Sequence, residues 1–472
     1  MNKYTVTAAG LVLSLGLVAG CGSSGDADSK EQGGKGTSGA ESGAQPKGPA
    51  YDGPAIPGLA AKPAWSMPRA GAIDLGDTFL FVKDADGEYA LGGPYEDDPV
   101  DGTTGTLHTS DAPEPVTLEF RDVKTGAVRK SLKVTTTHVA ATTWHNGVPA
   151  VDVRTSSVKE SDGLSAEKET ASITVYSSEG AQLGKTDRAA GDFHVHEGHI
   201  IEAADDASLR LTPIDGGKPR VVTCTGQLAS CSFDPRNKDI DGGSGHAPLI
   251  TGAYVFHVEN ATTYETKQEQ LVMSDLATGK KVWSTADVAP PAGVELNEDK
   301  ERTSGSIRVL GVRDGRIFTA WGAGAFATDT WVTATYDLAS GRQIGGTTKY
   351  AYADFPGDTI NTEGSYLRSP DDQLAASATE SGTAVWQLAD GKQVWTQQAG
   401  ENLMTPLRFS PSGVLYGTAG GDADTVLAVD ARTKKVLAKD LPEKSVPLFN
   451  KPSGYGYFST DAGFFVFPSQ AG

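Results

Sequence analysis

Short apolar runs of about four to eight residues recur along the chain from residue 63 onwards, and turns rich in Gly, Asp, Ser or Asn separate them. Residues 307–312 and 316–320 form one such pair, on either side of Asp314-Gly315. Apolar runs of this length bounded by turn residues predict β-strands joined as hairpins. Eight hairpins of this first kind are predicted, with turns at Gly76-Asp77, Asn146-Gly147, Glu197-Gly198, Thr251-Gly252, Asp314-Gly315, Asp371-Asp372, Ser412-Gly413 and Ser453-Gly454.

Seven of these hairpins are followed by a second hairpin, and its turn has a recurring composition. The first copy reads Asp122-Val-Lys-Thr-Gly126, in which the Asp can accept hydrogen bonds from the backbone two residues on. The Gly suits the left-handed backbone that a tight hairpin requires. Lys434 replaces this Gly in the seventh copy, so we expect it either to bear backbone strain or to use another turn. The second hairpins span residues 120–126, 175–180, 211–216, 272–279, 335–341, 385–391 and 429–434.

The eighth hairpin lacks a second hairpin, because only residues 455–458 and 464–467 follow as apolar runs. Fourth strands elsewhere read Lys281-Val-Trp283 or similar, and Pro63-Ala-Trp65-Ser-Met67 near the N-terminus has the same character. We therefore predict an all-β fold, an eight-bladed β-propeller in which this N-terminal strand completes the last blade and covers its edge. Seven blades is the alternative, if the short unit at residues 192–224 is an insertion.

Two segments carry a family resemblance. Thr278-Gly-Lys-Lys-Val-Trp283 and Asp390-Gly-Lys-Gln-Val-Trp395 resemble the repeat of the PQQ-like (quinoprotein-type) β-propeller superfamily, over roughly residues 63–468. The resemblance implies the fold and leaves the function open, because this superfamily holds both enzymes and binding proteins. The enzymes are dehydrogenases that use PQQ with calcium. A non-enzymatic member is the lipoprotein propeller of the outer-membrane assembly machinery.

The N-terminus has the pattern of an export signal. Lys3 precedes an apolar run from Val6 to Ala19, which is too short to span a membrane. The run ends in Leu17-Val-Ala-Gly-Cys21, which resembles a bacterial lipobox. The resemblance implies that residues 1–20 are a signal peptide and that Cys21 becomes the lipid-modified first residue, giving stable anchoring when it carries two or more chains. The alternative is an ordinary cleaved signal followed by an unrelated Cys.

Residues 21–62 contain mostly Gly, Ser, Ala, Pro, Asp and Lys, a composition that cannot bury enough apolar surface to order the chain. We predict a disordered tether there and the propeller at residues 63–472. No other segment could span a bilayer, so the protein is expected to be anchored to the cell membrane and to face the extracytoplasmic side.

The net charge limits the classes of binding partner, and the cysteines predict a disulfide. The net charge of −19 and a pI of about 4.8 argue against binding to nucleic acid and against electrostatic docking on anionic lipid. They are compatible with a basic partner. Cys224 and Cys231 are the only cysteines besides Cys21, and in an exported protein their spacing predicts a disulfide. A reactive or metal-binding pair is the alternative reading.

Two clusters are candidate cation sites. His194 and His196 share one face of a predicted strand and His199 lies beyond the turn, so the three could hold Zn²⁺ or Cu²⁺. Hydrogen bonding of these rings to neighbouring backbone is the alternative. Asp84, Asp86 and Glu88 alternate around Gly87 like part of a calcium loop, although the same residues also make an ordinary solvated turn.

No catalytic residues are predicted, because the chain lacks the G-x-S-x-G and H-E-x-x-H motifs and any phosphate-binding loop. Trp65, Trp283 and Trp395 are explained by packing between blades. The sequence therefore favours a binding or scaffolding module for an envelope protein or surface component, with no cofactor. One alternative is a PQQ-dependent dehydrogenase of alcohols or sugars, which would also need calcium. Another is a sensor of solutes or glycans.

Overall fold

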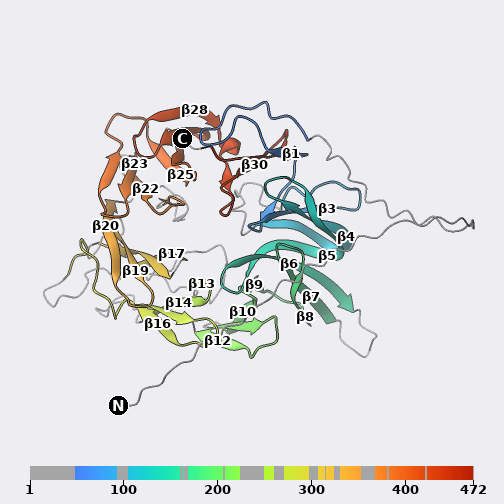
Figure 1. Ribbon diagram of the computed structural model, residues 1–472. Helices are drawn as coiled ribbons and strands as arrows, with labels where there is room; N and C mark the ends of the chain where they lie inside the picture. The colour runs from blue at the N-terminus through green and yellow to red at the C-terminus, as the bar shows by residue number, and fades with distance from the viewer. Residues whose placement is uncertain are drawn as a thin grey trace, which may run out of the picture. The chain divides into compact units, whose positions relative to one another are not determined.

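Antiparallel strands make up nearly all the regular structure in the computed structural model (Figure 1). Val, Ile, Phe and Thr alternate with polar residues along these strands, as is typical of half-buried β-structure. The structure describes residues 48–92, 105–159, 163, 168–205, 208–223, 249–259, 270–296, 307–313, 315–323, 330–351, 367–379, 382–419 and 422–470.

Hydrogen bonding arranges the strands of these residues into seven sheets. The largest contains β2 (Ile73–Asp74), β3 (Thr78–Lys83), β4 (Thr106–Asp122), β5 (Val128–Trp144), β6 (Val148–Lys159), β7 (Lys168–Tyr176) and β8 (Gln182–Ala189). Five four-stranded sheets follow: β9 (His194–His196), β10 (His199–Asp205), β11 (Ser208–Pro213) and β12 (Arg220–Thr223); β13 (Leu249–Thr251), β14 (Tyr254–Glu259), β15 (Gln270–Asp275) and β16 (Lys281–Ser284); β17 (Ile307–Arg313), β18 (Arg316–Gly322), β19 (Thr330–Asp337) and β20 (Gln343–Ala351); β21 (Leu367–Arg368), β22 (Leu374–Thr379), β23 (Gly382–Gln387) and β24 (Gln393–Thr396); β25 (Met404–Phe409), β26 (Val414–Ala419), β27 (Asp422–Asp430) and β28 (Val436–Pro442). The last sheet holds β29 (Leu448–Phe449), β30 (Gly456–Thr460), β31 (Gly463–Phe467) and β1 (Trp65–Met67), and a 3-10 turn, η1 (Glu443–Ser445), precedes it.

The N-terminal strand closes the last sheet, as the repeat pattern predicts. β1 pairs with β31 in antiparallel register, with Trp65 opposite Val466 and Met67 opposite Phe464. Residues near the two ends of the chain therefore share one sheet. The short unit from residue 194 to residue 223 forms a sheet of its own.

Hydrophobic clusters join each sheet to the next. One cluster contains Ile201 and Leu209 of one sheet together with Ile250 and Val255 of the following sheet. Similar clusters link the later sheets in chain order. The last sheet then packs on β3, where Phe79 and Phe81 meet Phe464 and Val466. This closed succession of antiparallel sheets is the β-propeller that the repeats predict.

The predicted turns fall between paired strands. The Asp122 turn joins β4 to β5, and the Oδ1 atom of Asp122 accepts hydrogen bonds from the backbone N–H groups of Lys124 (3.0 Å) and Thr125 (2.8 Å). Gly126 has φ +69° in this turn, and Lys434 has φ +63° at the equivalent place. Lys434 thus bears the left-handed conformation, the first of the two outcomes that its position predicts.

Side chains of the fourth strands fasten one sheet to the turn of the next. The Nε1–H of Trp65 in β1 donates to the carbonyl oxygen of Val123 (2.8 Å), and that of Trp395 in β24 donates to Ala431 in the same way (2.8 Å). β20 has Gly345 in place of a Trp, and the backbone next to it, at Gly346 and Thr347, approaches the turn at Gly391. The tryptophans therefore serve packing between sheets, as the sequence predicts.

The N-terminal strap, residues 49–61, is packed against the protein, and this corrects the predicted tether boundary at residue 62. Ile56 and Leu59 are buried in a cluster with Phe465 and Phe467 of β31. Tyr51 meets the rings of Phe467 and Phe465 edge-on, at centroid distances of 5.1 and 5.2 Å. Three well-spaced apolar side chains thus order a segment whose average composition is that of a linker.

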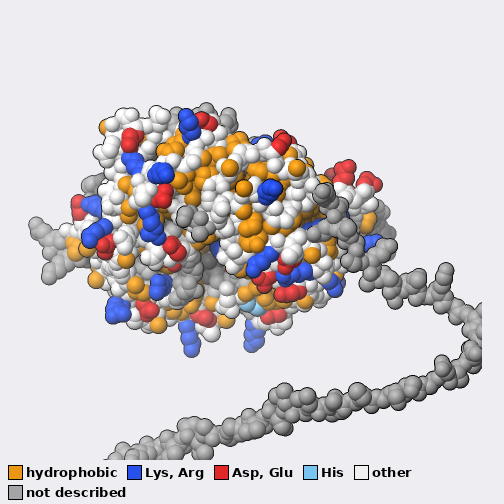
Figure 2. Space-filling view, turned by 45° about the horizontal axis from the view of Figure 1, so that its top comes forward, with side chains coloured by type: hydrophobic (Ala, Val, Ile, Leu, Met, Phe, Trp, Pro, Cys, Tyr) orange, Lys and Arg blue, Asp and Glu red, His pale blue; other side chains and the backbone are white. Residues whose placement is uncertain are grey.

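Figure 2 shows hydrophobic side chains gathered on the face that carries the top of Figure 1, where β1, β28 and β30 lie.

The two ends of the sheets differ in the kind of connection that they carry. The first and second hairpin turns, such as those at Gly76 and Gly126, lie at one end, which we call the turn end. The remaining connections leave from the opposite end, which we call the loop end. The connection between β3 and β4 is one of them, and its sequence includes Glu96, Asp97, Asp98 and Asp101 with no basic residue between them.

Candidate functional site

The predicted histidine site lies at the turn end, in the hairpin of β9 and β10. The Nε2 atom of His196 is 2.8 Å from the carbonyl oxygen of Ile250, and its Nδ1 atom is 3.4 Å from Oγ1 of Thr143. Both ring nitrogens are thus directed at protein groups of the neighbouring sheets. Burial lowers the pKa of His196 to about 4, so the ring is neutral at physiological pH.

His199 is placed differently. Its Nδ1 atom is 2.7 Å from the carbonyl oxygen of Glu197, and its ring centroid is 6.2 Å from that of His145. His145 in turn pairs with Asp215 through Nε2 and Oδ2 at 3.1 Å. Among the residues that the structure describes, no group of three or more His, Cys, Asp or Glu side chains is placed to hold a metal ion. The hydrogen bonds of His196 and His199 to backbone carbonyls are those of the alternative reading.

Glu197, which the sequence predicts only as a turn residue, is the group that connects this region. It has φ +49° and is 1% exposed. Its carboxylate accepts hydrogen bonds from the backbone N–H of Gly147 and of Gly252, both at 3.0 Å. These two glycines belong to the turns of the preceding and following units, so one side chain bridges three successive hairpins. Burial raises the pKa of Glu197 against these hydrogen bonds, which lower it.

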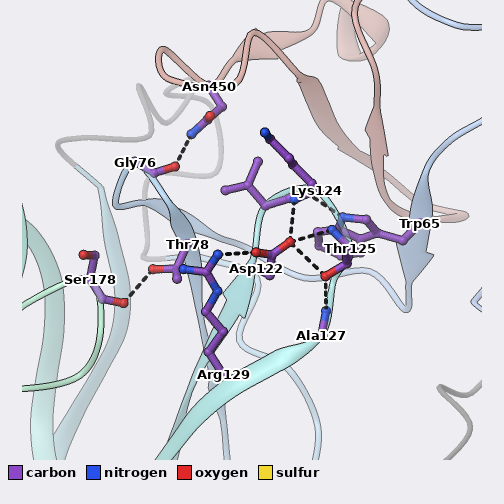
Figure 3. Close-up of polar contacts among 11 residues, drawn as sticks. Trp65, Gly76, Thr78, Asp122, Lys124, Thr125, Ala127, Arg129, Ser178 and Asn450 are labelled. Atoms are coloured by element: carbon purple, nitrogen blue, oxygen red, sulfur yellow. Dashed lines mark hydrogen bonds and ion pairs between the residues drawn. The ribbon is translucent and has the colours of Figure 1, made fainter. Parts of the chain in front are cut away.

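A second buried bridge closes the turn end between the last and the first sheet (Figure 3). The Nδ2 of Asn450 donates to the carbonyl oxygen of Gly76 and to Oδ1 of Asp74, both at 2.7 Å. The same Asp74 oxygen accepts the backbone N–H of Gly76 at 2.9 Å. Burial raises the pKa of Asp74 to about 6, although these hydrogen bonds oppose the rise.

Replacing Asp74 by Asn should remove the loss of folding stability that ionisation of this buried carboxyl group causes. The folded chain binds the Asp74 proton more tightly than an unfolded chain with a pKa of 3.8, so the stability from this group is full below that value and is lost as the pH rises through about 6. Asn keeps an acceptor for Gly76 and Asn450 and carries no charge. We expect Asp74→Asn to gain on the order of 2–3 kcal/mol relative to the wild type between about pH 4 and pH 7.5. Denaturant unfolding at a series of pH values measures the difference.

The matched control is Asp77→Asn, which removes an exposed carboxylate from the same turn. Its free energy of unfolding should follow the wild-type pH profile. If the Asp74→Asn profile ran parallel to that of the wild type as well, Asp74 would have to be hydrated in the folded protein, and the argument would be wrong.

The polar groups around Asp122 also serve the turn itself (Figure 3). Arg129 pairs with the Oδ2 atom of Asp122, and Oγ1 of Thr125 donates to Oδ1 at 2.8 Å. Burial would raise the pKa of Asp122, but the hydrogen bonds from Thr125 and Arg129 hold it below its usual value. Nearby, Oγ1 of Thr78 donates to the carbonyl oxygen of Ser178 at 2.8 Å, which ties two turns together.

The predicted calcium loop is a hydrogen-bonded turn in this structure. The backbone N–H of Glu88 donates to Oδ1 of Asp84 (2.9 Å), and the N–H of Asp84 donates to the carbonyl oxygen of Glu88 (3.0 Å). Gly87 has φ +87° at the bend. Asp84, Asp86 and Glu88 are exposed, and the calcium site stays a prediction.

Three predicted residues lie outside the described ranges: Cys21, Cys224 and Cys231. The lipid anchor and the disulfide therefore stay predictions. Across the described part of the chain, no helix has the length and apolar character needed to cross a bilayer.

Comparisons with known proteins add little. No family model matches the chain, and no curated protein sequence resembles it. Among solved structures, Hsv2p of Kluyveromyces lactis is similar at 10% identity, covering 61% of this chain and 73% of its own, with a TM-score of 0.30. The dihydro-heme d1 dehydrogenase NirN is similar at 14% identity over 84% of this chain and 78% of its own, with a TM-score of 0.34. A eukaryotic initiation factor is similar at 9% identity over 83% and 96%, with a TM-score of 0.36. None of these likenesses is close enough to bear on the fold or the function.

Proposed function

We propose that the protein is a lipid-anchored, extracytoplasmic binding scaffold built on an eight-bladed β-propeller. The seven-stranded sheet supplies two of the blades, because β5 pairs with β4 over residues 128–140 and with β6 over residues 138–144. Each of the other six sheets supplies one blade. The PQQ-like repeat is consistent with this architecture, and no part of the proposal requires PQQ.

The contrast between the two ends of the sheets carries the proposal. At the turn end, the buried polar groups bridge and cap turns: Glu197 holds two glycine N–H groups, and Asn450 holds Asp74 and Gly76. Side chains occupied in this way are not arranged for catalysis. The loop-end connections are longer and carry most of the net charge of −19. Binding specificity in propellers commonly resides in such connections, so we infer a basic segment of an envelope protein or surface component as the partner.

The tether sets the reach of the scaffold. With Cys21 as the lipid-modified residue and Gly48 as the first described residue, about 26 residues separate the anchor from the propeller. A flexible segment of that length has a root-mean-square span of about 28 Å. That distance places the propeller close to the membrane surface while leaving it free to turn. Cys224 and Cys231 would cross-link one loop-end connection.

Neutralising the acidic insertion should reduce partner capture. We expect the variant Glu96→Gln/Asp97→Asn/Asp98→Asn/Asp101→Asn to lose about ten-fold or more in crosslinking yield to its partner, because the attraction to a basic surface is lost. The measurement is crosslinking of the membrane-anchored protein in its native envelope, followed by quantification of the captured protein.

The matched control removes four acidic side chains from the turn end: Asp77→Asn, Asp215→Asn, Asp371→Asn and Asp390→Asn. It should capture the partner as well as the wild type does. Capture by the wild type that is no better than that of an unrelated lipoprotein would contradict the scaffold function, and equal losses in both variants would contradict the use of the loop end.

A further inference from the structure

The fourth strand of the first blade is strongly basic. Lys124, Arg129, Lys130 and Lys133 lie along the turn into β5 and its first half, and all four side chains are exposed. Asp122 is the only acidic residue between residues 120 and 135, and it pairs with Arg129. Val128, in the middle of this group, is 46% exposed. Among the described strands, residues 128–134 of β5 pair only with β4, so no described strand covers their other edge.

This basic strand lies next to the closing strand of the propeller. Trp65 of β1 donates to the carbonyl oxygen of Val123, and its ring covers Gly126 in the turn that begins β5 (Figure 3). The edges of β1 and of the first half of β5 therefore form one continuous outer surface, which we call the seam wall. The seam wall also includes two exposed basic residues next to β1, Lys62 and Arg69.

The described acidic groups near the seam wall include Asp461, Glu179 and two exposed residues, Asp52 and Asp77. Asp461 lies 3.2 Å from Arg69, and Ser177 donates to Glu179 at 2.9 Å. Asp52 is exposed on the strap. Lys62, Lys124, Lys130 and Lys133 have no ion pair within the described part of the chain, which leaves a local excess of positive charge.

The chain also enters the propeller beside the seam wall. Pro49 accepts a hydrogen bond from Oγ of Ser66 in β1 at 2.7 Å, so the residue that leads to the tether is held against the closing strand. A tether of about 26 residues keeps this side within about 28 Å of its anchor on average. No other basic strand of the described residues has this relation to the point of entry.

We propose that the seam wall docks on the surface of an anionic lipid bilayer. The inference deepens the proposed function, since it rests on the same membrane location. The net charge of −19 argued against such docking, but ionic screening limits the interaction to charges within about 8–10 Å of the surface. At that range the exposed lysines of the seam wall face the lipid, whereas about half of the acidic residues of the chain belong to loop-end connections. Each basic residue near an anionic membrane contributes about five-fold in affinity.

Vesicle binding by the unlipidated protein tests the proposal. The full chain carrying Cys21→Ser cannot be acylated, so any binding reports on the protein surface alone. We expect it to co-sediment with vesicles of phosphatidylglycerol and phosphatidylcholine at about 50 mM salt, to bind pure phosphatidylcholine weakly, and to be released at about 500 mM salt. Adding Lys124→Glu/Lys130→Glu/Lys133→Glu should weaken binding by about 100-fold.

A second triple variant controls for net charge. Lys218→Glu/Lys280→Glu/Lys435→Glu removes exposed lysines from the turns before three other fourth strands and changes the net charge equally. It should keep vesicle binding, and circular dichroism should show both variants folded. Equal losses in the two variants, or no preference for phosphatidylglycerol, would overturn the proposal. Binding to a poly-glutamate peptide without binding to vesicles would assign the seam wall to an acidic protein segment instead. Failure of Cys21 acylation in cells would contradict the anchor and leave the vesicle result standing.

Discussion

Replacing Gly391 by alanine is expected to destabilise the protein by on the order of 4 kcal/mol. Gly391 has φ +73°, and a Cβ atom there would overlap the carbonyl oxygen of Thr347 in the neighbouring sheet. Backbone cannot move aside as a side chain can, so the two sheets would have to separate at this point. Gly346→Ala should behave alike, because its Cβ would overlap the backbone of Asp390. Chemical denaturation with tryptophan fluorescence measures the free energy of unfolding.

Gly315→Ala is the matched control for this effect. Gly315 has φ +70°, nearly the conformation of Gly391, but no atom lies within 4 Å of the position its Cβ would take. Only the backbone strain of about 1–2 kcal/mol should appear. Lys434 holds φ +63° in the native chain, which shows that a side chain is accepted in this turn where the neighbour leaves room. Equal losses for Gly391→Ala and Gly315→Ala would mean that the sheets can adjust to the added atom.

Removing the closing strand should abolish cooperative folding. A chain that begins at Pro68 lacks both β1 and the strap, so it loses Trp65, Tyr51, Ile56 and Leu59 from the cores around β31. It also opens the edge of β31, whose residues Gly463–Phe467 are buried and apolar apart from the glycine. An exposed apolar edge strand promotes aggregation. Size-exclusion chromatography and a thermal melt should show aggregation and no cooperative transition.

A chain that begins at Pro46 separates this effect from loss of the tether. It keeps the strap and β1 and should melt as the full chain does, because its described contacts are unchanged. A cooperative melt of the chain beginning at Pro68 at an unchanged midpoint would contradict the closing role of β1.

Most of the fold could be predicted because each turn carries its own local signal. Asp122 and Gly126 specify their hairpin through backbone conformation and hydrogen bonds a few residues apart, and the same chemistry recurs down the chain. The place of the Trp65 strand in the last sheet followed from counting strands. The order of the strap did not follow, because Tyr51, Ile56 and Leu59 are too sparse to form a periodic pattern and are fixed by rings from residues 458–467.

The candidate site was harder to predict, since it depends on contacts between sheets. His194, His196 and His199 are conspicuous in the sequence, yet the residue between them, Glu197, makes the bridge. The one sequence signal for this bridge was that Glu197 stands at a hairpin turn, next to the first-hairpin turns of the units before and after it. Which N–H groups its carboxylate would reach depended on how adjacent sheets stack.

The closing strand also fixes the order in which the protein can fold. β1 is among the first structured residues to be synthesised, and its partner β31 lies about 400 residues later. Closing a loop of that length costs about 3 kcal/mol more in chain entropy than closing one of ten residues. The intermediate sheets form from neighbouring hairpins, so they can assemble early, whereas the ring of sheets cannot close before β31 is available. A nascent chain therefore keeps open sheet edges until β31 has been synthesised.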